Sequence, residues 1–190
     1  MRILFTSNDP GSAQQNNAVA NLLNQNKPYD LACITSKVSL GYYSSIFKEK
    51  LYFDQNEIHY KNKIKDFISY FKPDFIFHLA AQSLVGNSYD NPSGTMTTNI
   101  IGVNNILDAV RVVGKKCTAV VITSDKCYDN VEWCWGYKET DALGGKDIYS
   151  GSKAAAEVLF KSYYHSFFKD KSNTSIATVR AGNVIGGGDW

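Results

Sequence analysis

The stretch that decides the fold is CTAVVITSDK, at residues 117–126. Its first eight residues are mostly apolar and rich in β-branched side chains, as expected for a strand that is covered on both faces. The stretch ends in the polar trio Ser124, Asp125 and Lys126. A parallel strand presents its C-terminal end to the ligand crevice of an open α/β sheet. The stretch therefore predicts a buried parallel strand with reactive groups at its tip.

Strand-like and helix-like segments alternate along the rest of the chain. The other predicted strands are Arg2–Thr6, Asp30–Thr35, Lys50–Phe53, Asp74–Leu79 and Ser175–Ala181. The predicted helices are Ser12–Asn26, Lys61–Phe71, Ser93–Val113 and Asp147–Phe168. In the last helix an apolar stripe is formed by Ala156, Leu159, Phe160, Tyr163 and Phe167. This alternation predicts an α/β fold with a Rossmann-like, doubly wound parallel sheet.

Composition narrows the class of protein. A length of 190 residues suits one domain, and a net charge of +2 without a basic stripe does not favour nucleic acid. The apolar runs are too short for a membrane span. The three His and four Cys residues form no metal motif, so no metal is expected. We interpret the cysteines as reduced thiols of a cytoplasmic protein.

Tyr149 and Lys153 stand four residues apart at the start of a predicted helix. Residues at this spacing share one helix face, and an ammonium group beside a phenol stabilises the phenolate and lowers its pKa. With the trio at the strand tip, the pair is suited to binding and deprotonating a hydroxyl group. The alternative is a Tyr and a Lys that merely share an exposed helix face, because this spacing also arises by chance.

Several short motifs occur in order from about Lys72 to the end of the chain. They are FHLAAQ at 77–82, TNIIG at 98–102, TSDKCYDN at 123–130, EWCWGY at 132–137, LGG at 143–145, Y-x-x-x-K at 149–153 and RAGNVIGGGDW at 180–190. Together they resemble the extended short-chain dehydrogenase/reductase family. Within it the chain is most similar to the nucleotide-sugar 4,6-dehydratases, above all those that act on CDP-glucose. The trio beginning at Ser124 is the specific part, since relatives acting on other nucleotide sugars usually carry Thr-Asp-Glu or Thr-Glu there.

The resemblance implies a role for each reactive group. Tyr149 would take the proton of the sugar C4 hydroxyl while NAD⁺ oxidises that carbon, and Ser124 would hydrogen-bond the same oxygen. Lys153 would hold the nicotinamide ribose and lower the pKa of Tyr149. Asp125 would protonate the leaving C6 hydroxyl, and Lys126 stands where relatives carry the base that removes the C5 proton. The alternative for Asp125 and Lys126 is a solvated ion pair at a strand end.

The same resemblance suggests further binding residues. Besides Tyr149 and Lys153, the candidate cofactor-binding residues are Gly11, Asp54, Leu79, Ala80, Ala81, Gln82, Asn99 and Thr123. The candidate substrate-binding residues are Ser83 and Asn183. For Asp54 and Ser83 an ordinary solvated position is an equal alternative. Trp133 and Trp135, in the long loop 128–146, either stack on a base or sugar or pin that loop to the core.

The turn after the first strand is expected to face the cofactor. The residues DPG at 9–11 are a turn signal, and Ser12-x-x-Gln15 has the pattern of a capping box. A helix N-terminus at this position is an anion site, because its unpaired N–H groups and its dipole face outward. In a dinucleotide-binding fold the pyrophosphate lies there.

This turn nevertheless departs from the family pattern Gly-x-x-Gly-x-x-Gly. Only Gly11 remains, out of register, while Ser7 and Ala13 add side chains and Pro10 removes an N–H donor. Lys37, after the second strand, points to NADP as an alternative to NAD.

The chain is expected to be a partial one. Residues 1–190 would form the NAD(P)-binding domain of an extended short-chain dehydrogenase/reductase, truncated before the substrate-binding domain. The predicted function is a nucleotide-sugar 4,6-dehydratase, or part of one, with CDP-glucose as substrate. The alternatives are an epimerase or reductase of the same fold and a non-catalytic nucleotide-binding remnant. A homodimer is expected through helices 93–113 and 147–168, with Tyr164 and Phe168 on a second buried face.

Overall fold

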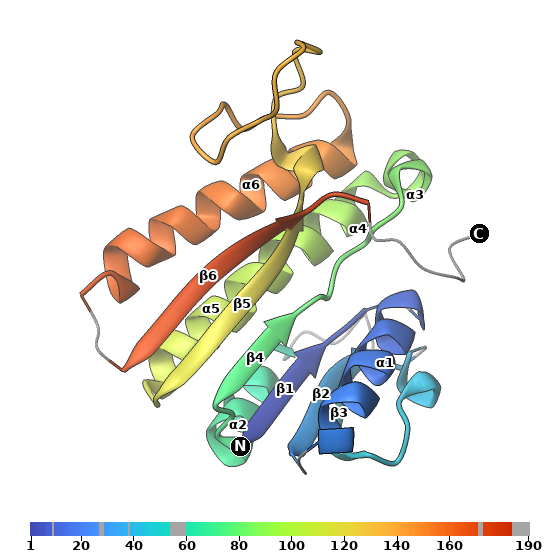
Figure 1. Cartoon of the computed structure of the whole chain (residues 1–190), viewed down its shortest axis with the longest axis vertical. Helices are drawn as coiled ribbons and strands as arrows, with labels where there is room; N and C mark the ends of the chain where they lie inside the picture. The colour runs from blue at the N-terminus through green and yellow to red at the C-terminus, as the bar shows by residue number, and fades with distance from the viewer. Residues whose placement is uncertain (9, 27–28, 38, 54–59, 171–172, 184–190) are drawn as a thin grey trace.

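The computed structural model describes residues 1–8, 10–26, 29–37, 39–53, 60–170 and 173–183, which form a parallel sheet flanked by helices (Figure 1). The strands are β1 (Arg2–Thr6), β2 (Asp30–Ser36), β3 (Phe47–Phe53), β4 (Phe75–His78), β5 (Cys117–Ser124) and β6 (Thr174–Ala181). Their order is β3-β2-β1-β4-β5-β6, and every neighbouring pair is parallel. The direction of the order reverses between β1 and β4, as in a Rossmann-like sheet. The predicted fold class is confirmed.

Helices lie on both sides of this sheet. The longer ones are α1 (Pro10–Asn26), α2 (Tyr60–Phe71), α5 (Gly102–Val113) and α6 (Ile148–Tyr163). The shorter elements are α3 (Val85–Asp90), α4 (Pro92–Met96), η1 (Leu40–Tyr42), η2 (Thr97–Ile101), η3 (Asp125–Cys127) and η4 (Tyr164–Phe168). In Figure 1, α1 lies in front of β1 to β3, whereas α5 and α6 lie behind β5 and β6. Right-handed crossovers explain this, because the strands advance in opposite directions from β1.

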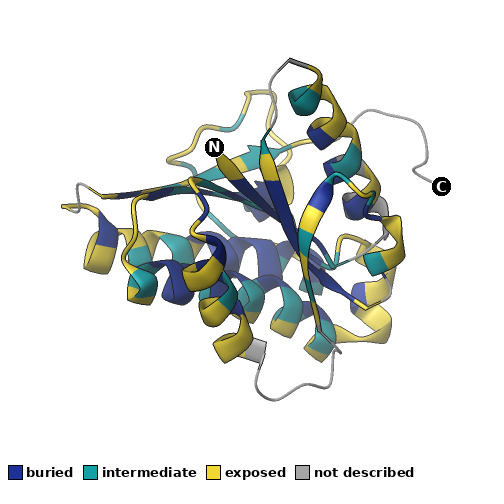
Figure 2. Ribbon diagram, turned by 90° about the horizontal axis from the view of Figure 1, so that it is seen from below, coloured by how far each residue is buried: buried dark blue, intermediate teal, exposed yellow. Residues whose placement is uncertain are grey.

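Both faces of the sheet carry apolar side chains, since successive strand residues point to opposite sides. Leu4 and Ile76 are adjacent in register, and they pack with Ile106 of α5 in the core behind the sheet. On the front face, Phe5 packs with Ala20 of α1. Figure 2 shows the buried residues concentrated in the strands and on the helix surfaces that face them.

Several predicted boundaries differ from the structure. Strand β3 begins at Phe47, three residues before the predicted start. Helix α1 begins at Pro10, so Ser12 lies inside the helix and is not its N-cap. Proline fits the first helical turn because no intrahelical hydrogen bond needs its missing N–H. Helix α3 was not predicted, and the helix predicted over 93–113 is instead two helices joined by a π-turn.

A second π-turn changes which face the end of α6 presents. Phe168 is 3% exposed and belongs to the core, whereas Phe167 is 41% exposed. A π-turn adds a residue to one helical turn and so shifts the apolar stripe by one position. The prediction was therefore wrong for both residues: Phe167 leaves the stripe, and Phe168 is not available to a dimer surface.

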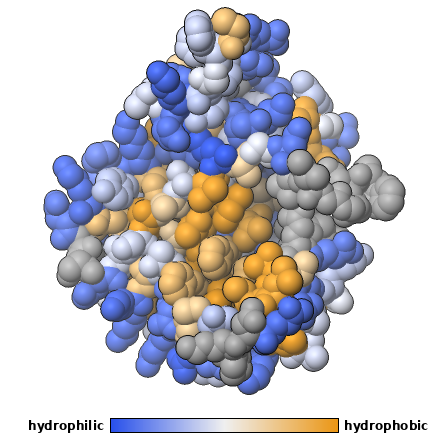
Figure 3. Space-filling view, viewed as in Figure 1, coloured by the Kyte–Doolittle hydropathy of each residue, from blue (hydrophilic) through white to orange (hydrophobic). Residues whose placement is uncertain are grey.

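The front of the sheet is open over part of its width. In the described part of the chain, α1 covers β1 to β3 on this side, but no helix covers β5 and β6 (Figure 1). Ile122 and Val179 are neighbours in register, and neither is fully buried. Figure 3 shows a hydrophobic area in the middle of this face. Parallel sheets are usually covered on both faces, so this area is an unpaired apolar surface.

All four cysteines are unpaired thiols, and Cys33 and Cys117 are buried in strands as predicted. Among the described helices, none has the length and apolar character needed to cross a bilayer.

Candidate functional site

The predicted reactive trio lies at the C-terminal tip of β5. Ser124 ends the strand, and its hydroxyl accepts a hydrogen bond from the Lys126 amide at 3.2 Å, which begins the short turn η3. The same hydroxyl donates to Oδ1 of Asp125 at 3.0 Å. Asp125 and Lys126 are exposed, while Ser124 is buried. The trio therefore presents two charged groups to solvent beside one buried hydroxyl.

Helix α6 places Tyr149 next to this tip. Asp147 caps the helix by accepting hydrogen bonds from the Ser150 amide at 2.9 Å and the Ser150 hydroxyl at 2.7 Å. Burial tends to raise the pKa of Asp147, but these bonds hold it below its usual value. The first helical turn is thereby fixed, and the packing of α6 on η3 brings the Tyr149 phenol next to the Ser124 hydroxyl.

The electrostatics of Tyr149 differ from the prediction. Burial raises the pKa of this phenol above its usual value, and the hydrogen bond with Ser124 only partly opposes that effect. Lys153 is buried, and its Nζ lies 5.9 Å from the Tyr149 ring centroid. The expected net lowering of the Tyr149 pKa by Lys153 is thus not seen.

Asn99 ties the predicted cofactor loop to α6. It lies in η2, where its Oδ1 accepts from the Gln82 amide at 2.8 Å and its Nδ2 donates to the Gln82 carbonyl at 3.1 Å. Its Nδ2 also donates to the Ser152 hydroxyl at 2.8 Å, which in turn donates to the Tyr149 carbonyl at 2.6 Å. The residue is therefore a connector between main-chain segments, and a direct cofactor contact is not needed to explain it.

The predicted cofactor loop directly follows β4. Leu79 and Ala80 are half-buried, Ala81 is buried, and Gln82 bonds Leu84 and Thr95 through its side chain. These small side chains lie next to the switch point between β1 and β4, where ligands bind in such sheets.

His78, at the end of β4, is a buried group that the sequence did not single out. Its Nδ1 lies 2.6 Å from the Thr6 hydroxyl, and its Nε2 has no hydrogen-bond partner in the described structure. Burial lowers the pKa of His78 to about 3, with a smaller contribution from the charge of Lys153. The imidazole is therefore neutral, and it fills the space beneath the cofactor loop.

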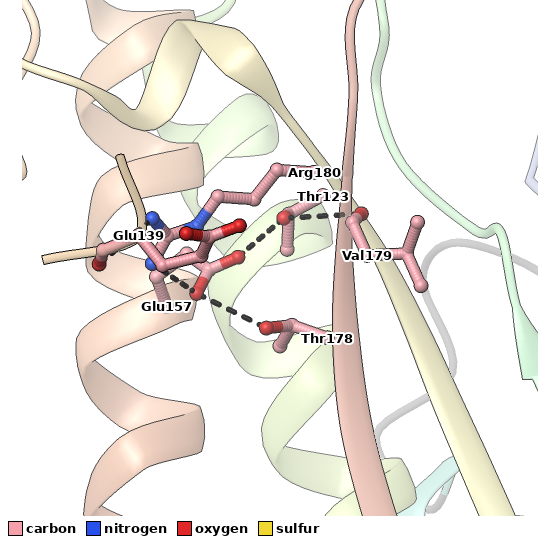
Figure 4. A network of polar contacts seen from close by, with 6 residues as sticks. All are labelled: Thr123, Glu139, Glu157, Thr178, Val179 and Arg180. Atoms are coloured by element: carbon pink, nitrogen blue, oxygen red, sulfur yellow. Dashed lines mark hydrogen bonds and ion pairs between the residues drawn. The ribbon is translucent and has the colours of Figure 1, made fainter. Parts of the chain in front are cut away.

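Thr123 behaves differently from the other predicted cofactor residues. Its hydroxyl donates to Oε1 of Glu157 on α6, as Figure 4 shows. This leaves the main chain of Thr123, and not its side chain, to meet a cofactor. Glu157 also pairs with Arg180 of β6 at 3.0 Å. Sequence reasoning assigned no role to either member of this pair, although Glu157 lies one helical turn beyond Lys153.

The turn after β1 is closed by hydroxyl groups. Ser7 and Thr35 lie at the ends of β1 and β2, and their hydroxyl oxygens are 2.9 Å apart. The Tyr43 hydroxyl donates to Ser7 at 2.8 Å and accepts from Nδ2 of Asn16 at 2.7 Å. All four residues are buried. Side chains thus fill the place where glycines would admit the pyrophosphate of a dinucleotide.

The remaining predicted residues stay predictions. Gly11 lies in the first turn of α1, and Asp54 falls outside the described residues. Ser83 and Asn183 are exposed, and Asn183 lies two residues beyond Ala181, the register partner of Ser124. Trp135 is 74% exposed and Trp133 leans on Tyr137, with ring centroids 5.7 Å apart, so neither tryptophan pins the loop to the core.

The sheet order defines a Rossmann-like α/β domain, with the Ser, Tyr and Lys cluster at its C-terminal edge. A family model described as GDP-mannose 4,6 dehydratase matches residues 15–178, and the chain belongs to this family.

Two relatives indicate where in this family the chain lies. It is 48% identical over 132 residues to a CDP-glucose 4,6-dehydratase of Salmonella typhimurium, covering 67% of this chain and 37% of the relative. It is 30% identical over 130 residues to a CDP-paratose 2-epimerase of Salmonella typhi, covering 60% of this chain and 38% of the relative. The chain therefore spans less than two-fifths of the length of either relative.

Solved structures agree on the fold. A UDP-glucose 4-epimerase of Thermotoga maritima matches with a TM-score of 0.70 at 21% identity, covering 95% of this chain and 55% of the other. A UDP-glucose 4-epimerase of Thermus thermophilus, solved with NAD, matches with a TM-score of 0.71 at 23% identity, covering 95% and 54%. At these identities the likeness shows the architecture alone.

Proposed function

We propose that the chain carries the catalytic groups of a nucleotide-sugar 4,6-dehydratase that converts CDP-glucose to CDP-4-keto-6-deoxyglucose. The observation that carries the proposal is that α6 packs against the tip of β5, which brings Tyr149 next to Ser124 where Asp125 and Lys126 stand exposed. The 48% identity to a CDP-glucose 4,6-dehydratase supports the choice of substrate. Residues 1–190 would then be the cofactor-binding part of a longer enzyme.

The cofactor proposed is NAD, with NADP as the alternative. The donors at the reactive end fit a nicotinamide ribose, because Tyr149 and Lys153 share a helix face beside the loop 79–82. The end near Ser7 fits less well, since that turn is filled by buried side chains. When bound, NAD would supply a reversible oxidation at the sugar C4 carbon.

The chain's own residues would move the protons. Tyr149 accepts the proton of the C4 hydroxyl, and Ser124 holds the same oxygen by a hydrogen bond. Asp125 donates a proton to the leaving C6 hydroxyl, while Lys126 removes the proton at C5. Elimination needs an acid and a base across adjacent carbons. The pair at the strand tip can supply both once bound substrate shields it from water, because burial favours the neutral carboxylic acid and the neutral amine.

Turnover of CDP-glucose is the direct test. The longest polypeptide that contains this chain is incubated with CDP-glucose and NAD⁺, and the 4-keto product is followed by its absorbance in base. Tyr149→Phe is expected to lower the rate at least about 100-fold, because it removes the acid/base group. Tyr163→Phe, at the other end of α6, is the matched control and keeps the rate. Turnover of a different nucleotide sugar, with none of CDP-glucose, contradicts the substrate.

A non-catalytic nucleotide-binding remnant is the second candidate, and the closed turn at Ser7 favours it. Equilibrium titration of the 190-residue chain with NAD⁺ and NADP⁺ separates the two. Micromolar binding supports the enzyme, whereas absent binding together with no turnover supports the remnant. An epimerase or reductase would show interconversion of sugars without loss of water.

Two further properties belong to this proposal. We propose a homodimer through the helices α5 and α6, which carry the exposed apolar residues Val112 and Val158, together with Tyr164 at the start of η4. The unpaired thiols fit a reducing, cytoplasmic setting.

A further inference from the structure

A single buried carboxylate connects three elements behind the tip of β5. Glu157 is 4% exposed, and it lies on α6 facing the sheet (Figure 4). Its Oε1 accepts from the Thr123 hydroxyl of β5. Its Oε2 accepts from Nη2 of Arg180 at 3.0 Å and from the Thr178 hydroxyl at 3.3 Å, both on β6.

The sequence spacing relates this carboxylate to the candidate site. Glu157 follows Lys153 by four residues and Tyr149 by eight, so the three share one face of α6. On the strand, Thr123 directly precedes Ser124. The bond between Glu157 and Thr123 therefore fixes the distance between the helix that carries Tyr149 and the strand that carries Ser124.

The other end of the network reaches the long loop 128–146. The Arg180 guanidinium lies 4.9 Å from the Tyr128 ring centroid, and its Nη1 donates to the Glu139 carbonyl at 3.2 Å. The base of the loop is closed by backbone bonds from Asp129 to Ala142 and from Gly144 to Cys127, both at 2.9 Å. One side chain thus contacts both the start and the second half of the loop.

Stability alone is a poor explanation for such a pair. A buried ion pair loses its hydration, and apolar residues of the same size often stabilise a protein as well or better. What the pair does provide is a fixed geometry, because each carboxylate oxygen has a named partner and the guanidinium is planar and directional. The site needs such a geometry, since small displacements of reacting groups lower rates sharply.

We propose that Glu157 and Arg180 are positioning residues, Glu157 setting Ser124 against Tyr149 and Arg180 holding the loop 128–146 over the strand tips. This inference rests on the proposed dehydratase function for its kinetic part. The two parts of the proposal predict separate effects. Loss of the Thr123 hydroxyl should slow the chemical step, whereas loss of the Arg180 guanidinium should loosen the loop 128–146.

Kinetics of matched variants test the first half, in the longest polypeptide that contains this chain. Thr123→Val removes the hydroxyl and keeps the shape, and it is expected to lower kcat about tenfold with KM within twofold. Thr174→Val is the control, because it removes a buried hydroxyl that donates to the Lys115 carbonyl at the far end of the sheet. Equal kcat values for the two variants overturn this half.

Conservative replacement tests the second half. Arg180→Lys keeps a positive charge beside Glu157 but cannot also serve Glu139 and Tyr128. It is expected to keep kcat within about threefold while raising KM about tenfold, whereas Arg180→Ala lowers kcat as well. An Arg180→Lys variant with unchanged KM overturns the role of Arg180.

Hydrogen exchange separates failure of this inference from failure of the proposed function. In the 190-residue chain, Arg180→Lys is expected to speed exchange of the Asp129 and Gly144 amides about tenfold, and Thr123→Val that of the Lys126 amide. Thr174→Val leaves all three unchanged. If no nucleotide sugar reacts but these rates change, the dehydratase assignment fails and the positioning network stands. Unchanged exchange in both variants overturns the network.

Discussion

At the scale of single residues, the buried Ser7 side chain closes the turn after β1. Its hydroxyl oxygen lies 2.9 Å from that of Thr35 and accepts from Tyr43 at 2.8 Å, so the end of β1 is closed. Ser7→Gly removes the side chain and lets a phosphate approach the backbone. We expect NAD⁺ to bind about tenfold more tightly, which corresponds to about 1.4 kcal/mol.

Thr35→Val is the control for this change. It breaks the contact between the two hydroxyls but leaves the Ser7 side chain in place. Isothermal titration calorimetry of both variants with NAD⁺ shows whether removing the Ser7 side chain, or only breaking its contact with Thr35, changes the affinity. Equal affinities for Ser7→Gly and wild type would show that the turn does not limit binding.

The reactive residues were easier to predict than those that support them. Ser124 and Tyr149 belong to short motifs that are visible in the sequence, and the packing of α6 on η3 brings them together. Glu157, Arg180 and His78 act through contacts across 23 to 72 residues of sequence, which no local pattern encodes. The one signal that could have pointed to Glu157 is its spacing of four residues from Lys153, which places both on one helix face.

At the scale of elements, the π-turn η4 decides which phenylalanine joins the core. Phe168→Ala should destabilise the chain by about 3–5 kcal/mol, because it empties a buried site. Phe167→Ala should cost under about 1 kcal/mol, since that ring is 41% exposed and rests on Arg111. Urea unfolding measures both. A larger loss of stability for Phe167→Ala than for Phe168→Ala would contradict the π-turn and favour the regular helix that the sequence predicted.

Buried thiols in the strands make stability fall in alkali. Burial raises the pKa of Cys33 in β2 and of Cys117 in β5 to about 12, from an ordinary value of 9.0. The unfolded chain loses these protons first as the pH rises, so the stabilisation is complete below pH 9 and is lost progressively towards pH 12. At pH 10.5 the loss is about 2 kcal/mol for each thiol relative to pH 8.

Unfolding at pH 8 and pH 10.5 measures this loss. Cys33→Ala should reduce the difference between the two pH values, although it lowers stability at both by removing buried atoms. Cys134→Ala removes an exposed thiol and serves as the control. A pH difference that Cys33→Ala leaves unchanged would assign the alkaline loss to other groups.

Strands were predicted more closely than helix interruptions. The six strands follow from continuous apolar runs, and β1 and β5 match the expected bounds residue for residue. The π-turns and α3 depend on tertiary contacts such as those of Asn99 with Gln82 and Ser152. Periodicity cannot reveal them, because it assumes a constant 3.6 residues per turn.

At the scale of the whole molecule, two apolar surfaces compete as sites of association. One is the open front of β5 and β6, where Val179 is 50% exposed. The other is the outer surface of the helices behind the sheet, where Val158 of α6 is 54% exposed. The two valines are a matched pair for mutation. They are similarly exposed, and a Val→Glu substitution at either position adds the same negative charge to its surface.

Sedimentation of Val158→Glu and Val179→Glu in the 190-residue chain decides between the surfaces. If the dimer forms through α5 and α6, a charge at position 158 must be desolvated at the interface, and the variant should be monomeric. A charge at position 179 should leave the dimer intact and reduce binding of a hydrophobic dye, because it interrupts the open apolar face. Dissociation by Val179→Glu alone would instead place the dimer contact on the front of the sheet. The helical dimer would then be excluded, since the two surfaces lie on opposite faces of the sheet.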